Sequence, residues 1–171
     1  MSDGQPTDAR DAPPAPVTVL GVGNPIMGDD GLGLELLSRL RGQRPDSRVA
    51  YVDGGTGGME LVPVVQGATR LLVLDAVAGT TPGQVVRFSG DQLPRLLSSS
   101  LSPHQVSLLD VLAAARLLDH EPEQIEVVGI VPESVALRIG LSAPVAEALW
   151  EAVGAAVAVL DGWLARLDAQ L

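Results

Sequence analysis

Residues 17–41 read VTVLGVGNPIMGDDGLGLELLSRLR, and this stretch decides the fold. Its first six residues, Val17–Val22, form a continuous apolar run rich in β-branched side chains, which predicts a buried strand. Residues 31–41 then carry leucines at helical spacing, which predicts a helix with one apolar side. A buried strand that leads through a glycine-rich turn into such a helix is typical of α/β proteins.

The rest of the chain repeats this alternation of strand and helix. Further buried strands are predicted at 48–52, 70–76 and 125–131, and helices at 59–66, 91–97, 102–118 and 142–167. Another strand, at 84–88, comes after a Thr-Pro-Gly turn, and the linker before it is too short for a helical crossover. That strand is therefore predicted to run antiparallel to the strand at 70–76. The sequence predicts a three-layer α/β/α sandwich with a mostly parallel sheet.

Composition and charge narrow the possible functions. The chain is 46% hydrophobic, which is typical of a folded protein. Its 11 arginines, with no lysine, face 21 acidic residues, and the net charge of −10 argues against nucleic acid or an anionic membrane as a partner. The absence of cysteine excludes disulfides and thiolate metal sites. A transition-metal site would need carboxylates and one of two histidines, His104 or His120.

The first sixteen residues, MSDGQPTDARDAPPAP, differ in composition from the rest of the chain. They are polar and rich in proline and lack the apolar core of a signal peptide, so we expect a disordered tail at 1–16 before a single domain at 17–171. The apolar stretch at 155–160 is too short to span a bilayer. These features favour a cytoplasmic protein.

Polar residues come directly after several of the predicted strands. In parallel sheets, ligands bind beyond the carboxyl ends of the strands, so residues at these positions are expected to meet at one edge. The residues concerned are Asn24, Asp29, Asp30, Asp53, Asp75 and the segment 132–134.

The glycines after the first strand suggest a dinucleotide site, but the fingerprint is incomplete. Gly21 and Gly23 are present, whereas Ile26 stands where the third glycine belongs. Asp53 lies thirty residues past Gly23, although the ribose-binding acid usually comes at about twenty. A tight turn is enough to explain the glycines. Of the acids Asp29 and Asp30 at the helix start, one is expected to cap the helix and the other to face the cleft.

Asp75 and His104 are the strongest single candidates for a site. Asp75 ends an apolar run, so its carboxylate needs a cation, a metal or a ring of backbone N–H groups. His104 stands at a predicted helix start, where the helix dipole favours the neutral imidazole that a metal requires. A lone histidine there also fits simple local packing. His120 follows a predicted helix end and is interpreted as a solvated loop residue. Asp53, taken by itself, is more typical of an Asx-turn than of a catalytic residue.

One histidine and two carboxylates would form a three-ligand site with open positions. Such a site suits Zn²⁺, Ni²⁺, Mn²⁺ or Fe²⁺. The chain has no H-E-x-x-H motif, no G-x-S-x-G motif and no cysteine nucleophile. A metal is therefore the only evident source of hydrolytic power.

Five motifs taken together resemble a known family, the hydrogenase maturation endopeptidases, which process the large subunit of NiFe-hydrogenases. The resemblance covers about residues 17–150 and is specific because the motifs occur in order. They read GVGNPIMGDDGLG, VDGGTGGMEL, LLVLDAV, SPHQVSLLDVL and VVGIVPES.

The resemblance implies both a fold and a set of site residues. The fold is a phosphorylase/hydrolase-like five-stranded mixed sheet with strand four antiparallel. Asp30, Asp75 and His104 correspond to the family's metal ligands. Asp53 is implied to take part in catalysis without binding metal. Some relatives carry glutamate at the position of Asp30, so the shorter side chain here changes the reach of that carboxylate.

The resemblance also implies an activity and a partner. The protein is expected to be an endopeptidase, of aspartyl or metallopeptidase type, that removes the C-terminal tail of the NiFe-hydrogenase large-subunit precursor after nickel insertion. Nickel would be presented by the precursor, and zinc or cadmium are other divalent ions for the site. The alternatives are a metal-dependent hydrolase of another substrate and a non-catalytic, nickel-checking chaperone of the precursor.

Overall fold

A five-stranded mixed sheet forms the centre of the computed structural model, which describes residues 15–92 and 108–171. The strand order is β2-β1-β3-β5-β4. The strands are β1 (Val17–Val22), β2 (Val49–Gly55), β3 (Arg70–Ala76), β4 (Val85–Ser89) and β5 (Gln124–Ile130). Of these five strands, only β4 runs antiparallel to its neighbour, β5, so the predicted mixed sheet with an antiparallel fourth strand is confirmed. β4 is also antiparallel to β3, as predicted from the short linker, but the two strands do not pair, because β5 lies between them.

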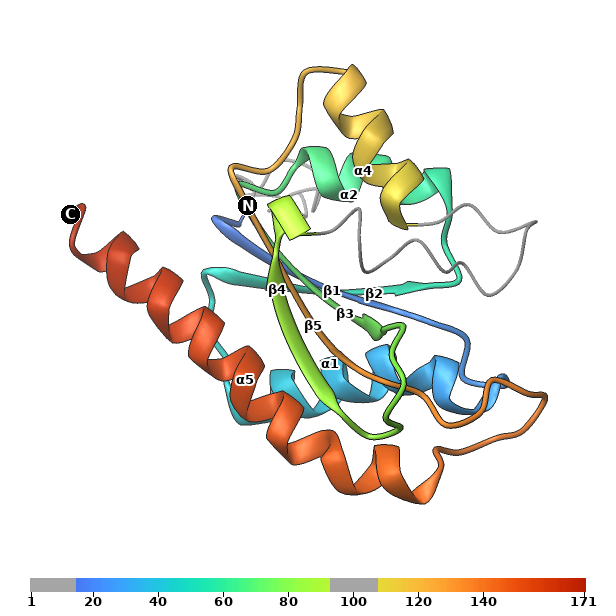
Figure 1. Ribbon diagram of the computed structural model, residues 1–171. Coiled ribbons are helices and arrows are strands. Elements are labelled where there is room, and N and C mark those ends of the chain that lie inside the picture. Colours follow the sequence, from blue (N-terminus) through green and yellow to red (C-terminus); the bar gives the residue numbers. More distant parts are fainter. Residues whose placement is uncertain (1–14, 93–107) are drawn as a thin grey trace, which may run out of the picture.

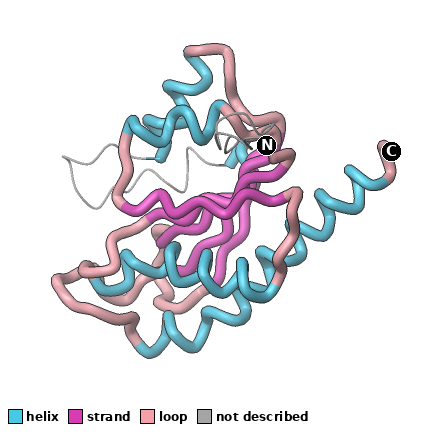
Figure 2. Tube along the Cα trace, turned by 180° about the vertical axis from the view of Figure 1, so that it is seen from behind, coloured by secondary structure: helices cyan, strands magenta, loops and turns pink. Residues whose placement is uncertain are grey.

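Helices cover both faces of the sheet. α1 and α5 lie on one face, and α2 and α4 on the other, as Figure 1 shows and the view from behind repeats (Figure 2). The described α-helices are α1 (Leu32–Gln43), α2 (Val62–Gln66), α4 (Leu108–Leu117) and α5 (Ala143–Asp168). Short 3-10 turns are η1 (Gly28–Gly31), η2 (Met59–Leu61) and η3 (Gly90–Gln92). The predicted three-layer sandwich is confirmed.

The side chains of β3 point alternately to the two faces of the sheet, so they contribute to two separate core layers. Leu72 and Leu74 pack toward α1 and α5, whereas Leu71 and Val73 pack toward α2 and α4. By length and composition alone, α5 could cross a bilayer. Its apolar residues instead form a buried stripe against the sheet, which is the usual reason for such a helix in a globular protein.

Some element boundaries differ from those predicted. β2 continues to Gly55, so Asp53 lies within the strand, paired with Gly21, instead of ending it. The turn η1 precedes α1, which begins at Leu32. The described part of the predicted helix at 91–97 is η3, and that of the helix at 102–118 begins at Leu108. Residues 1–14 of the predicted tail lie outside the described residues, and β1 begins at Val17, where the domain is predicted to begin.

Candidate active site at the carboxyl end of the sheet

Two glycines allow the turn that carries Asp30 to pack directly on the ends of β1 and β3. A Cβ atom on Gly33 would lie 2.2 Å from the carbonyl oxygen of Val22 and 2.4 Å from that of Leu74. Gly23 has a φ of +143°, and a Cβ there would lie 1.9 Å from the carbonyl oxygen of Asp30. Only glycine fits such approaches. The start of α1 is thereby brought beside Leu74, the residue before Asp75.

Asp30 is a partly buried carboxylate at this edge. Its Oδ2 accepts a hydrogen bond of 3.0 Å from the backbone N–H of Asn24. Burial raises the pKa of Asp30, and the hydrogen bond from Asn24 opposes this rise without cancelling it. The carboxylate form of Asp30 is therefore incompletely stabilised by the described residues.

Asp75 lies at the end of β3 and is also only partly accessible to solvent. Its Oδ1 accepts a hydrogen bond of 2.7 Å from the backbone N–H of Ala76. The pKa of Asp75 is raised to about 8, mainly by burial and in smaller part by the nearby charge of Asp30, while the hydrogen bond from Ala76 opposes the rise. The two carboxyl groups therefore lie close enough to repel one another. Within the described residues, no arginine or histidine pairs with either of them.

Asp29, next in sequence to Asp30, has the opposite environment. It is completely buried, and its oxygens accept hydrogen bonds from the N–H groups of Glu133 (2.9 Å), Ser134 (3.1 Å) and Ser142 (2.7 Å). The hydroxyl of Ser142 donates a further bond of 2.7 Å. Burial alone would raise the pKa of Asp29, but these bonds outweigh it and the pKa is lowered. Asp29 thus fixes the loop after β5 to the turn after β1.

The expectation that one acid caps the helix start is therefore wrong in its detail. Neither η1 nor α1 has a side-chain capping bond, and Asp29 binds a segment more than a hundred residues away instead. Ser142, the residue before α5, is a structural partner of Asp29 that the sequence pattern does not indicate. The only sequence signal is the predicted convergence of segment 132–134 on the same edge, which does not reveal the partner.

Asp53 stays apart from the pair formed by Asp30 and Asp75. Its Oδ1 accepts a hydrogen bond of 2.9 Å from the N–H of Gly55, as in an Asx-turn. Asp53 pairs with Gly21 on β1, and Gly21 pairs in turn with Leu74 on β3. Two strand spacings, about 10 Å, therefore separate Asp53 from the end of β3. In the part of the chain that the structure describes, no hydrogen bond or ion pair joins Asp53 to the other two acids.

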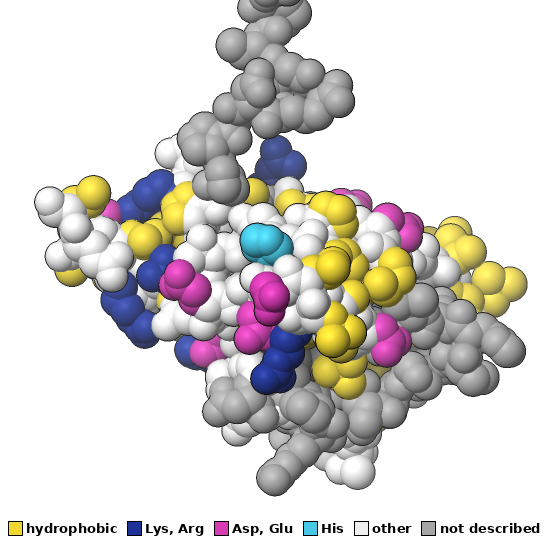
Figure 3. Space-filling model, turned by 90° about the horizontal axis from the view of Figure 1, so that it is seen from above, with side chains coloured by type: hydrophobic (Ala, Val, Ile, Leu, Met, Phe, Trp, Pro, Cys, Tyr) yellow, Lys and Arg dark blue, Asp and Glu magenta, His cyan; other side chains and the backbone are white. Residues whose placement is uncertain are grey.

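His104 lies outside the described residues, so the structure does not place it. Within 15–92 and 108–171, no three histidine, aspartate or glutamate residues come together as a metal-binding group. His120 is exposed in the loop after α4. Seen from above, the molecule carries charged side chains of both signs, with most of the hydrophobic ones toward one end (Figure 3). Of the four predicted site residues, the structure brings together Asp30 and Asp75.

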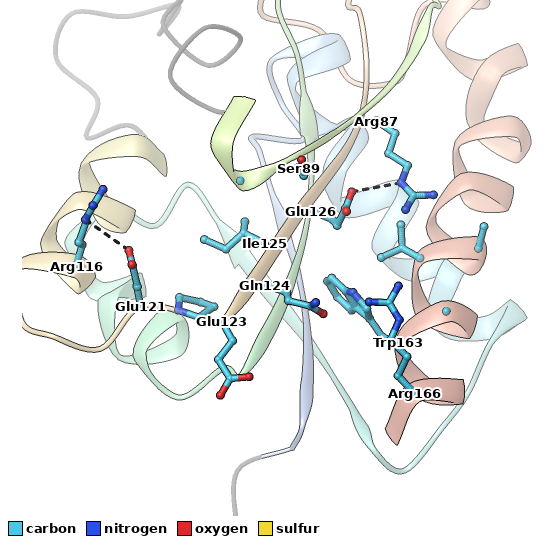
Figure 4. A pocket seen from close by; sticks show the side chains of 15 residues that line it. Arg87, Ser89, Arg116, Glu121, Glu123, Gln124, Ile125, Glu126, Trp163 and Arg166 are labelled. Carbon is cyan, nitrogen blue, oxygen red and sulfur yellow. Dashed lines mark hydrogen bonds and ion pairs between the residues drawn. The ribbon is translucent and has the colours of Figure 1, made fainter. Parts of the chain in front are cut away.

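A pocket of about 540 Å³ lies elsewhere, near the first residues of β5 (Figure 4). Its walls include Gln124 and Trp163, and two ion pairs, Arg87–Glu126 (3.3 Å) and Arg116–Glu121 (3.8 Å), lie at it. Gln124 pairs with the first residue of β3, whereas Gly129 pairs with Asp75. Five residues of strand, about 17 Å, therefore separate this pocket from the carboxylate pair.

Comparisons with known proteins give a consistent result. The family model described as "HycI: Hydrogenase maturation protease" matches residues 34–159. The Hydrogenase 2 maturation protease of Escherichia coli K12 is 37% identical over 140 residues, which cover 79% of this chain and 84% of that protein. The hydrogenase expression/formation protein HupD of Rhizobium leguminosarum bv. viciae is 35% identical, covering 88% of this chain and 77% of its own.

Solved structures agree with the sequence matches. The hydrogenase maturating endopeptidase HybD from Escherichia coli superposes with a TM-score of 0.78 at 33% identity, covering 85% of this chain and 92% of that chain. An endopeptidase from Escherichia coli, solved in solution, gives a TM-score of 0.76 at 36% identity. The match covers 84% of this chain and 91% of that chain. The family model alone spans well over half of the chain. The chain therefore belongs to the hydrogenase maturation protease family.

Proposed function

We propose that this protein is the endopeptidase that removes the C-terminal tail of a NiFe-hydrogenase large-subunit precursor after nickel has been inserted. It is a protease by family, and C-terminal processing of the hydrogenase large subunit is the function of that family. The observation that carries the proposal is the pair of neighbouring, partly buried carboxylates, Asp30 and Asp75, at the ligand-binding edge of the sheet.

The carboxylate pair fits a divalent cation. Burial raises the pKa of both acids, and the charge of Asp30 raises that of Asp75 further. A divalent ion between the oxygens would offset both the repulsion and the loss of solvation. Asp29 shows how the same fold stabilises a carboxylate without a cation, namely with four hydrogen bonds. From the described residues Asp75 accepts one such bond, so a cation is the simpler partner for it.

His104 is the proposed third ligand. By strand alternation, Asp75 points to the face opposite to that of Leu74, which is the face covered by α2 and α4. His104 precedes the first described residue of α4, Leu108, by four positions, and four residues span at most about 14 Å. Two carboxylates and an imidazole suit Ni²⁺, and also Zn²⁺ or Cd²⁺.

A divalent ion held there would polarise the scissile carbonyl or lower the pKa of a bound water. Asp30 and Asp75 would hold such an ion in their ionised forms, and Asp29 holds the turn that positions Asp30. Asp53 is exposed and already accepts the N–H of Gly55, so we assign it to orienting the substrate. Nickel itself is part of the substrate: only a nickel-loaded precursor would complete the site, which makes cleavage depend on prior insertion.

Cleavage of the purified precursor tests this proposal. Nickel-loaded and nickel-free precursor would each be incubated with the parent protein, with His104→Ala and with His120→Ala, and the mass of the large subunit would be measured over time. We expect cleavage of the loaded precursor by the parent and by His120→Ala, and almost none by His104→Ala. Binding of the loaded precursor without cleavage by the parent would favour the chaperone alternative. Cleavage by His104→Ala at the parent rate would exclude this metal site.

A further inference from the structure

Three exposed apolar side chains gather beside the proposed active site. Ile26, Leu137 and Ile139, here called the apolar ledge, are 51%, 80% and 85% exposed. Ile26 lies in the loop after β1, and the other two lie in the loop after β5. Both ribbon views show these loops side by side at one end of the sheet (Figures 1 and 2). Side chains this exposed add little to the core, so their position calls for another reason.

The ledge is held in place by the fold. The N–H of Arg138 donates to the carbonyl oxygen of Ile26 (3.0 Å), and the N–H of Gly28 donates to that of Arg138 (2.7 Å). These two bonds make a parallel bridge between Met27 and Arg138. The four bonds to the carboxylate of Asp29 fix the same loop at both of its ends. A surface that is already ordered loses little conformational entropy when a partner binds.

The ledge is continuous with the carboxylate pair. Ile26 precedes Asp30 by four residues, within one turn that also includes the hydrogen bond from Asn24 to Asp30. Asp29 connects the loop of Leu137 and Ile139 directly to the residue before Asp30. A polypeptide that brings a peptide bond to Asp30 can therefore lie against this surface.

Arg138 adds a positive charge to the ledge, which favours a partner with an acidic group. It is exposed between Leu137 and Ile139, and in residues 15–92 and 108–171 no acidic side chain pairs with it. In a chain with a net charge of −10, an unpaired arginine at the edge of the site favours a partner that supplies a carboxylate.

We propose that the apolar ledge and Arg138 form the docking surface for the protein substrate, and that they receive a segment carrying apolar side chains and one acidic group beside the bond that is cut. This inference rests on the proposed function and adds to it a site for substrate recognition. The ledge contributes to binding of the precursor, while the carboxylate pair carries the chemistry.

The test is a kinetic comparison with a matched control. In the full-length protein, Leu137→Ser combined with Ile139→Ser removes two exposed side chains of the ledge. The control, Leu117→Ser, changes a leucine that is 84% exposed at the end of α4. With loaded precursor, we expect the double variant to raise KM by about tenfold or more and to leave kcat within about twofold, because docking residues act on binding. Leu117→Ser should match the parent. An unchanged KM in the double variant would overturn the proposal.

Arg138→Gln tests the charge. We expect it to raise KM and to weaken the dependence of KM on salt concentration, because the parent's attraction for an acidic group is screened by salt. The same salt dependence in the parent and in Arg138→Gln would contradict an acidic group at this position.

Two further measurements separate the possible failures. Precursor binding to Asp75→Asn, with and without the ledge substitutions, tests docking even if the parent does not cut. Loss of binding in the ledge variant would then support the ledge although the proposed function had failed. Sedimentation of the parent and the double variant tests for a second copy of this chain. A parent dimer that dissociates on ledge substitution, with precursor binding unchanged, would assign the surface to self-association and overturn the proposal.

Discussion

Asp29 and Asp30 are consecutive in sequence, yet their carboxylates have opposite roles in the structure. Asp29 is fully buried and accepts four hydrogen bonds, and its pKa is lowered. Asp30 accepts one backbone hydrogen bond, and its pKa is raised by burial. The first residue holds two loops together, so that the second can face Asp75 at the edge of the sheet.

This difference predicts that Asp29 contributes to stability. In Asp29→Ala, the N–H groups of Glu133, Ser134 and Ser142 would lose their buried acceptor. We expect a loss of about 3 kcal/mol or more in the free energy of unfolding, measured by urea denaturation. Asp53→Ala, which removes an exposed carboxylate with a single local bond, should cost about 1 kcal/mol or less. Equal losses in the two variants would contradict the clamping role of Asp29.

A second prediction concerns the pH dependence of the metal-free protein. The pKa of Asp75 in the folded protein is about 8, above an unfolded value near 3.8. Between these values the folded state binds more protons than the unfolded state, so this group's contribution to stability falls as pH rises. In the presence of a chelator, Asp75→Asn should therefore flatten the fall in stability between pH 5 and 8, and at pH 8 it should be more stable than the parent. If the parent instead became more stable relative to Asp75→Asn as the pH rose from 5 to 8, the raised pKa of Asp75 would be contradicted.

Metal affinity gives the third prediction. Asp30→Asn and Asp75→Asn should each weaken binding of Ni²⁺ or Zn²⁺ by about tenfold or more in a calorimetric titration, since each removes a charged ligand. Asp53→Asn should bind the ion as the parent does, because Asp53 lies about two strand spacings away. Affinity in the parent should also fall as pH is lowered, because protons compete for Asp75 and for an imidazole whose ordinary pKa is near 6.5. If Asp53→Asn weakened metal binding as much as Asp75→Asn does, the ion would have to lie nearer to β2 than proposed here.

The sequence predicts those parts of the molecule that depend on local patterns. β3 occupies the predicted residues 70–76, because its short, unbroken apolar run is typical of a strand with both faces buried. Asp75 is identifiable from the sequence because it ends that run. The role of Asp29 is not, because its partners lie 104 to 113 residues away and bind it largely through backbone N–H groups, which have no sequence signature. The predicted end of β2 is wrong, because pairing with β1 continues through glycines whose local preference is for a turn.

The last prediction separates site geometry from helix propensity. Gly33 and Gly42 both lie in α1, but a Cβ on Gly33 would meet two strand carbonyl oxygens at 2.2 and 2.4 Å, whereas nothing lies within 4 Å of a Cβ on Gly42. Gly33→Ala must move the start of α1 away from β1 and β3. We expect a loss of about 2 kcal/mol or more in the free energy of unfolding. Gly42→Ala should instead gain up to about 1 kcal/mol.

Activity should divide the two variants in the same way. Moving the start of α1 changes the distance from Asp30 to Asp75, so Gly33→Ala should cut the loaded precursor far more slowly even at temperatures where it remains folded. Gly42→Ala should keep the parent rate. The measurements are cleavage rates beside circular dichroism on the same samples. Parent-level cleavage by folded Gly33→Ala would show that the close packing of α1 on the strands is not what positions Asp30.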